Sequence, residues 1–362
     1  MNRRHTLAVL AWALVTVLGL TATQSFAEDP TKVGFVYVGP VGDHGWTYRH
    51  DVGRKAVEKA FGDKVKTSFV ESVSEGADAE RVIRDLAASG HKIIFTTSFG
   101  YMNPTVKVAR QFPDVRFEHA TGYKRGKNVS TYMARFYEGR YVIGKIAGQV
   151  TKSNVVGYIG SFPIPEVVRG INAFTLALKK VNPKATVKVV WVSSWYDPGK
   201  ESDAAKVLID QGADIIVQHT DSTAPLQAAQ SAGVHGFGQA SDMSQFAPKA
   251  HLTSIVDNWD GYYVSRVKAV MDGTWNSGDT WGGIDTGMVE LAPYNAEAMS
   301  KEIVDDAAAT AKAIADGSLH PFAGPIKDQS GKERVAEGQT LSDKDLLGMN
   351  WYVEGVEGEL PK

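Results

Sequence analysis

Two tryptophans lie in loops where an aromatic ring can stack on a ligand. Trp46 lies in the segment GPVGDHGWTY (39–48), after a short apolar run and at the expected start of a helix. Trp195 lies in SSWYDP (193–198), after another apolar run. An indole stacks on a planar ring with about 1 kcal/mol beyond its buried area. We expect both rings to contact a ligand; the alternative is that each packs within its own half of the chain.

Polar and aromatic side chains follow other apolar runs. Asp221 in HTDS (219–222) and Asp242 in ASDM (240–243) each stand beside a hydroxyl residue. Such a carboxylate can accept hydrogen bonds from ligand N–H or O–H groups, or can cap the next helix. The matching segment of the first half, SFGYMN (98–103), supplies Phe99, Tyr101 and Asn103 as further ligand-binding candidates.

The elements that must hold these loops alternate between strand and helix patterns. Short β-branched runs predict strands, and apolar residues at helical spacing predict the helices between them. The strands are expected at 32–39, 65–71, 92–97, 114–119, 155–160, 187–192, 214–219 and 233–238, and the helices at 47–61, 79–89, 104–111, 166–180, 200–210, 224–231 and 295–316. In open parallel sheets, ligands bind beyond the carboxyl ends of the strands, which is where the candidate loops lie.

The second half of the chain repeats the first at an offset of 122 residues. Residues 81–95 align with 203–217, and 137–142 align with 259–264. The period is that of a whole domain rather than of a solenoid unit. We predict an α/β fold of two Rossmann-like, doubly wound lobes with a hinge and a ligand cleft between them. A G-x-G-x-x-G fingerprint is absent after the first strand, so no dinucleotide site is expected.

The repeat also predicts where the chain changes lobe. The crossings are expected near 130–134 and 254–257, which are partners in the repeat. The first lobe would then hold residues 31–132 and about 257–320, and the second lobe 133–256. The Gly- and Asp-containing tail 321–362 is expected to wrap the surface of one of the lobes.

The N-terminus and the composition indicate an exported protein. Residues 1–27 combine a basic start, an apolar run and small residues before Glu28, as in a secretory signal peptide cleaved near Ala27. With no cysteine in the chain, neither a disulfide nor a cysteine-linked lipid anchor is expected. We predict a periplasmic monomer, and the net charge of -2 gives no indication of a nucleic-acid partner.

Motifs for catalysis are missing. The nine histidines include no H-E-x-x-H pair, and no G-x-S-x-G elbow is present. We therefore expect no enzymatic activity, metal or cofactor. An exported hydrolase of nucleosides or glycosides remains the rival interpretation, because sequence alone does not show whether two carboxylates lie within about 5–10 Å.

The segment GPVGDHGW (39–46) resembles the basic membrane protein (BMP) family of ABC-transporter substrate-binding proteins, in the type I periplasmic binding protein clan. Further support comes from GAD (76–78), FPDVRF (112–117), ARFYEGRY (134–141) and DPGK (197–200). The resemblance covers about residues 31–275. It implies two lobes that close on a small ligand and deliver it to a membrane permease.

In family members similar to nucleoside receptors, two aromatic rings hold the base. By matching motifs, these rings would be Trp46 and Trp195, with Asp43 in the same loop. Thr47 stands where the family usually has asparagine.

Other positions depart from the nucleoside-binding pattern. Asn103 stands where those receptors have aspartate, and Asp257 where they have lysine. Asp242 matches the second of two aspartates, while the first has become Ala240. Part of the ribose-binding set is thus absent. The resulting prediction is a free purine base such as adenine, with a nucleoside, a riboflavin-like heterocycle or a sugar as alternatives.

Overall fold

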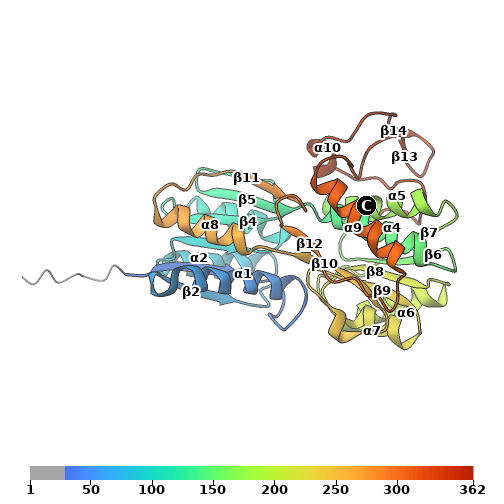
Figure 1. Cartoon of the computed structure of the whole chain (residues 1–362). Helices are drawn as coiled ribbons and strands as arrows, with labels where there is room; N and C mark the ends of the chain where they lie inside the picture. Colours follow the sequence, from blue (N-terminus) through green and yellow to red (C-terminus); the bar gives the residue numbers. More distant parts are fainter. Residues whose placement is uncertain (1–28, 362) are drawn as a thin grey trace, which may run out of the picture.

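The computed structural model describes residues 29–361, which form two parallel α/β lobes lying side by side (Figure 1). The two-lobed α/β architecture predicted from the repeat is thereby confirmed. The expected signal peptide, residues 1–27, lies outside the described residues.

The first sheet has six strands in the order β11-β5-β4-β3-β1-β2, and its strand pairs are parallel. Buried apolar residues fill the inner strands, as expected where helices cover both faces of a sheet. Its strands are β1 (Thr31–Val36), β2 (Val65–Val70), β3 (Ile93–Thr96), β4 (Arg116–Ala120), β5 (Val129–Ala134) and β11 (Asp279–Gly282).

The second sheet has seven strands in the order β12-β10-β9-β8-β6-β7-β15. Only the edge pair β10–β12 is antiparallel among its described pairs. Its strands are β6 (Val155–Gly160), β7 (Thr186–Trp191), β8 (Ile215–His219), β9 (His235–Gly238), β10 (His251–Asp257), β12 (Val289–Leu291) and β15 (Val356–Glu357).

Helices connect the strands and cover the sheets. The helices expected from the sequence occur with ends shifted by at most two residues, except that the helix expected at 295–316 begins only at Lys301. They are α1 (Gly45–Phe61), α2 (Ala77–Ala88), α3 (Met102–Ala109), α4 (Phe136–Val150), α5 (Pro165–Val181), α6 (Pro198–Asp210), α7 (Ala224–Ser231), α8 (Asp260–Met271), α9 (Lys301–Ala315) and α10 (Asp343–Leu347), with short 3-10 turns η1 (Gly62–Lys64), η2 (Phe99–Tyr101) and η3 (Ser244–Phe246).

The chain changes lobe at the ends of matching strands. After β5, helix α4 packs against α5 of the second lobe; after β10, helix α8 packs against α1 of the first lobe. A third crossing lies between β11, in the first sheet, and β12, in the second. Residues 257–320, expected in the first lobe, are therefore divided: α8 and β11 belong to the first lobe, whereas β12 and α9 join the second.

The C-terminal tail belongs to the second lobe. Strands β13 (Ile326–Lys327) and β14 (Glu333–Val335) form a small separate sheet, and α10 packs against α5. Strand β15 then pairs with β7 at the edge of the second sheet. Figure 1 shows the tail running over this lobe, as a surface-wrapping segment would.

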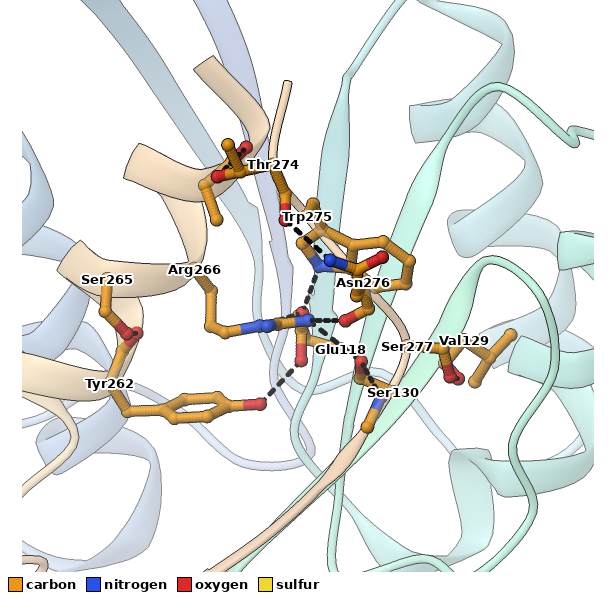
Figure 2. Close-up of polar contacts among 12 residues, drawn as sticks. Glu118, Val129, Ser130, Tyr262, Ser265, Arg266, Thr274, Trp275, Asn276 and Ser277 are labelled. Carbon is orange, nitrogen blue, oxygen red and sulfur yellow. Dashed lines mark hydrogen bonds and ion pairs between the residues drawn. The ribbon is translucent and has the colours of Figure 1, made fainter. Parts of the chain in front are cut away.

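A buried carboxylate ties α8 to the first sheet (Figure 2). Glu118 on β4 has no exposed surface and accepts hydrogen bonds from Arg266 Nε at 2.6 Å and Tyr262 Oη at 2.6 Å, both on α8. Trp275 Nε1 donates to the same carboxylate at 2.6 Å. Since a buried charge is tolerated only with such partners, the network fixes the returning helix against the first lobe.

Candidate functional site

A pocket lies between the lobes, and its empty space, together with the solvent at its mouth, amounts to about 380 Å³. Both lobes supply its walls, mostly from loops that follow parallel strands. The lining residues are Val38, Trp46, Ser98, Phe99, Thr121, Glu166, Trp195, His219, Asp221 and Gln239. The structure thus brings together Trp46, Phe99, Trp195 and Asp221 among the residues singled out from the sequence.

Trp46 is held by its own lobe. It is the second residue of α1, and its Nε1 donates to the carbonyl oxygen of Thr97 at 2.6 Å. The preceding Gly45 has φ +79° and a Cβ there would lie 2.7 Å from the carbonyl oxygen of Asp221. Only glycine lets this turn approach the second lobe so closely, which explains the glycine before the tryptophan.

Trp195 enters the pocket from the second lobe, four residues after β7. Its ring lies 4.9 Å, centroid to centroid, from Phe162. Its Nε1 donates to Glu75 Oε1 of the first lobe at 3.3 Å. The two indoles therefore reach one pocket from opposite lobes, and each has its polar edge tethered.

Asp221 stands at the edge of the pocket and touches the first lobe. Its Oδ1 accepts the backbone N–H of Trp46 at 3.3 Å. Burial, with the nearby Glu201 carboxylate, raises the pKa of Asp221 to about 8. The carboxyl is therefore neutral at pH 7 and can donate as well as accept a hydrogen bond.

Six of the ten pocket residues were not singled out by the sequence reasoning, and three of them, Glu166, His219 and Gln239, carry polar groups from the second lobe. Glu166 is the second residue of the helix after β6, His219 ends β8, and Gln239 follows β9. Glu166 Oε1 lies 3.5 Å from His219 Nε2, while Glu166 Oε2 and His219 Nδ1 are buried without a hydrogen-bond partner. Burial lowers the pKa of His219 despite the nearby Glu166. The loop after β6, which repeats the loop carrying Trp46, was the signal that could have led to Glu166.

Other candidates lie outside this pocket on the surface. Asp43 is exposed and contacts His44 Nδ1 at 2.9 Å, and Asn103 is exposed and accepts a hydrogen bond from Lys124 at 2.8 Å. The Asp242 side chain is 45% exposed and accepts the backbone N–H of Ser244 at 2.9 Å. Asp242 thus takes the turn-capping role that was its alternative interpretation.

Three further candidates are buried but do not line the pocket. Thr47 accepts the backbone N–H of Gly39 at 3.3 Å through its hydroxyl, and borders an adjoining hollow. The Tyr101 hydroxyl donates to the carbonyl oxygen of Val73 at 2.6 Å. Asp257 ends β10 with no exposed surface, and burial raises the pKa of its unpartnered carboxyl well above the usual range.

A larger chamber, with an empty volume of about 750 Å³, adjoins the pocket. The two spaces share Phe99, Thr121 and Glu166. The chamber lies between the lobes as well, because Tyr123 and Leu347 border it from the first and second lobe. The chamber gives a larger ligand room to extend beyond the pocket.

The lobes touch around the pocket, as they do in a closed arrangement. Gly45 N–H donates to Ser241 Oγ at 2.8 Å, and Arg49 Nε donates to the carbonyl oxygen of Asp257 at 2.5 Å. Both bonds join the start of α1 to loops at the ends of β9 and β10. The two halves of the site are therefore in direct contact in this arrangement.

Neither a metal site nor a membrane span is found in the part of the chain that the structure describes. Within residues 29–361, no group of three or more histidine, cysteine or acidic side chains is placed to hold a metal ion. No helix in the same range has the length and apolar character needed to cross a bilayer.

Residues 30–318 match the family model described as ABC transporter substrate-binding protein, PnrA-like. The chain belongs to this family. It is 56% identical over 350 residues to a purine-binding protein of Brucella abortus (strain 2308), covering 96% of this chain and 99% of that one. It is 40% identical over 334 residues to a putative ABC transporter glucose-binding protein of Haloferax volcanii, covering 92% and 82%.

Solved structures of other solute-binding proteins have the same fold as this chain. An ABC-transporter solute-binding protein from Aeropyrum pernix K1 superposes with a TM-score of 0.71 at 17% identity, covering 82% of this chain and 94% of that one. One from Conexibacter woesei DSM 14684 gives a TM-score of 0.66 at 24% identity, covering 80% and 98%. At these identities the likeness concerns the architecture.

Proposed function

We propose that this protein binds a free purine base such as adenine and delivers it to the permease of an ABC importer. The observation that carries the proposal is the pair of indoles, Trp46 and Trp195, that reach one pocket from opposite lobes. Two such rings can hold a flat heterocycle on both faces, each adding about 1 kcal/mol beyond buried area. The purine-binding relative at 56% identity supports the same ligand class.

The polar groups around the rings suit a purine edge. Glu166 offers an acceptor for an exocyclic amine, and Asp221, neutral at pH 7, can donate to a ring nitrogen or accept from a ring N–H. Oε2 of Glu166, which is buried without a hydrogen-bond partner among the described residues, favours ligands that pair with it.

The residues that match ribose-binding positions favour a free base over a nucleoside. Asn103 and Asp242, at positions matching ribose-binding residues of similar receptors, are exposed and face other partners.

A sugar is the second candidate ligand. The relative at 40% identity is described as a putative glucose-binding protein, and tryptophan faces also stack on sugar rings. A sugar, however, presents hydroxyl groups all around its ring, whereas the pocket wall at Trp46 and Phe99 is apolar.

The protein acts by binding alone, as a periplasmic monomer. Hinge closure of the lobes would bury the ligand, and the closed rims would then dock on the permease. An exported hydrolase would instead consume its ligand. Mass spectrometry of the small molecule released on denaturation distinguishes these functions, because a binding protein returns the ligand unchanged.

Calorimetry tests the ligand. We expect adenine to bind at least tenfold more tightly than adenosine and far more tightly than glucose. A tenfold preference for adenosine would contradict the free base while leaving the purine class intact. Binding of glucose without binding of any purine would replace the proposal by the second candidate.

A further inference from the structure

A buried arginine determines which way one pocket amide points. Arg140, on α4, has no exposed surface, and its Nη2 donates to Oε1 of Gln239. The two ends of a glutamine amide look alike in shape, but a guanidinium has only donors. The oxygen of Gln239 must therefore face Arg140, which leaves the amide N–H₂ as the free end.

The residue that carries this free amide N–H₂ lies in the wall of the ligand pocket. Gln239 lines the pocket and is 3% exposed. In the described part of the chain, its Nε2 makes no hydrogen bond. The pocket wall of the second lobe thus includes the donor Gln239 Nε2 beside Asp221, His219 and Glu166, and Oε2 of Glu166 has no hydrogen-bond partner among the described residues.

The other nitrogen atoms of the Arg140 guanidinium make no hydrogen bond among the described residues. Its Nε and Nη1 are buried without a hydrogen-bond partner, and its guanidinium carbon lies 5.5 Å from the centre of the Tyr158 ring. Among the described residues, the bond to Gln239 is the one hydrogen bond that the side chain of Arg140 makes. The nearby buried carboxyl groups of Glu166 and Asp257 offset part of the cost of burying this charge, and the hydrogen bond to Gln239 in addition fixes the orientation of the amide.

We propose that Arg140 is a positioning residue that fixes the Gln239 amide, so that the pocket selects a heteroaromatic edge carrying an acceptor nitrogen beside an amine. This inference rests on the proposed function and narrows its ligand class to an aminopurine edge. The amine donates to Glu166 while the ring nitrogen accepts from Gln239. A ring without the amine leaves Glu166 unpaired in a buried site, which disfavours binding.

The first test compares two ligands in the wild-type protein. Adenine and unsubstituted purine have the same fused ring, but only adenine carries the amine. We expect adenine to bind at least tenfold more tightly by calorimetry. Equal affinity for adenine and purine would overturn the proposal that the pocket recognises the amine.

The second test is a double-mutant cycle between Arg140 and Gln239, which isolates their coupling from packing effects. Arg140→Met should weaken adenine binding about tenfold in the wild-type background and less than twofold in the Gln239→Ala background, where no amide remains to be oriented. An equal loss in both backgrounds would show that Arg140 acts through packing and would overturn the inference.

A third variant covers the case in which Arg140→Met does not fold. Gln239→Glu keeps the shape and the contact with Arg140 but replaces the donor by an acceptor. Adenine affinity should fall at least tenfold, and an unchanged affinity would overturn the inference. If the wild-type protein binds no purine at all, the proposed function fails and the inference with it; if it binds purines without this coupling, only the inference fails.

Discussion

Trp195 of the second lobe donates its indole N–H to the carboxylate of Glu75 in the first lobe, 3.3 Å away across the cleft. The same oxygen, Glu75 Oε1, accepts the Ser98 hydroxyl at 2.6 Å and the Gly100 backbone N–H at 2.9 Å. The first lobe therefore holds the carboxylate in place, and the tryptophan reaches it when the lobes meet. One hydrogen bond both orients a pocket ring and joins the lobes.

Removing this carboxylate should make the closed state shorter-lived. In Glu75→Ala, Trp195 loses its partner, so we expect purine to dissociate about fivefold faster, as for one hydrogen bond worth about 1 kcal/mol. Stopped-flow fluorescence of the tryptophans measures the rate. Glu80→Gln, on the surface of α2 in the same lobe, is the matched control and should dissociate at the wild-type rate. Equal rates for both variants would remove the role assigned to Glu75.

Trp195 itself should carry a large share of the affinity. Trp195→Ala removes one stacking face, and we expect a loss of about 2 kcal/mol, roughly 30-fold in Kd. Trp191→Phe is the control, because Trp191 is a partly exposed tryptophan on β7 that does not line the pocket. Calorimetry with adenine measures the affinity of both variants. A similar affinity for the two would show that Trp195 packs within its lobe and does not stack on the ligand.

Purine binding should weaken in alkaline solution. The pKa of Asp221, about 8, lies above its ordinary value because of burial and the nearby Glu201. A neutral ring that excludes water favours the neutral carboxyl further. Above pH 8 the ionised group must take up a proton when ligand binds, so affinity should fall by up to tenfold per pH unit.

Asp221→Asn provides the comparison for this pH dependence. The amide stays neutral, so the variant should keep near wild-type affinity at pH 7 and show a flat profile from pH 6 to 9. Calorimetry across this range measures both proteins. If the affinity of the Asn variant falls with pH as steeply as that of the wild type, Asp221 is not the group responsible for the pH dependence.

The network around Glu118 should determine stability rather than binding. Glu118→Ala leaves Arg266, whose side chain is 19% exposed, without its carboxylate, and we expect the free energy of unfolding to fall by about 3 kcal/mol. Urea unfolding measures the loss. Adenine affinity of the folded variant should equal that of the wild type, and a tenfold change would contradict a purely structural role.

The repeat and the apolar runs were sufficient to predict the two lobes, most helices and the strand-end loops. Hydrophobic periodicity reports local structure, and β5 and β10 stand where the repeat indicated the crossings. The third crossing was not predictable, since β12 joins the second sheet by an antiparallel edge pairing that leaves no periodic signal.

The candidate site was predictable only in part. Trp46 and Trp195 could be found because aromatic residues are conspicuous in loops that follow strands. Glu75 and Gln239 could not, because an exposed acidic residue and a strand-end amide have no distinctive pattern until the lobes meet or Arg140 is seen behind the amide. Contacts between distant segments depend on closure, which a one-dimensional pattern does not encode.

Three chain segments cross between the lobes, after β5, after β10 and between β11 and β12. Three connections between two bodies resist twisting and sliding more than bending, so we expect the lobes to move mainly by bending about these crossings. One pair of spectroscopic probes, one on each lobe, would then be enough to follow the whole motion, because a single distance describes it.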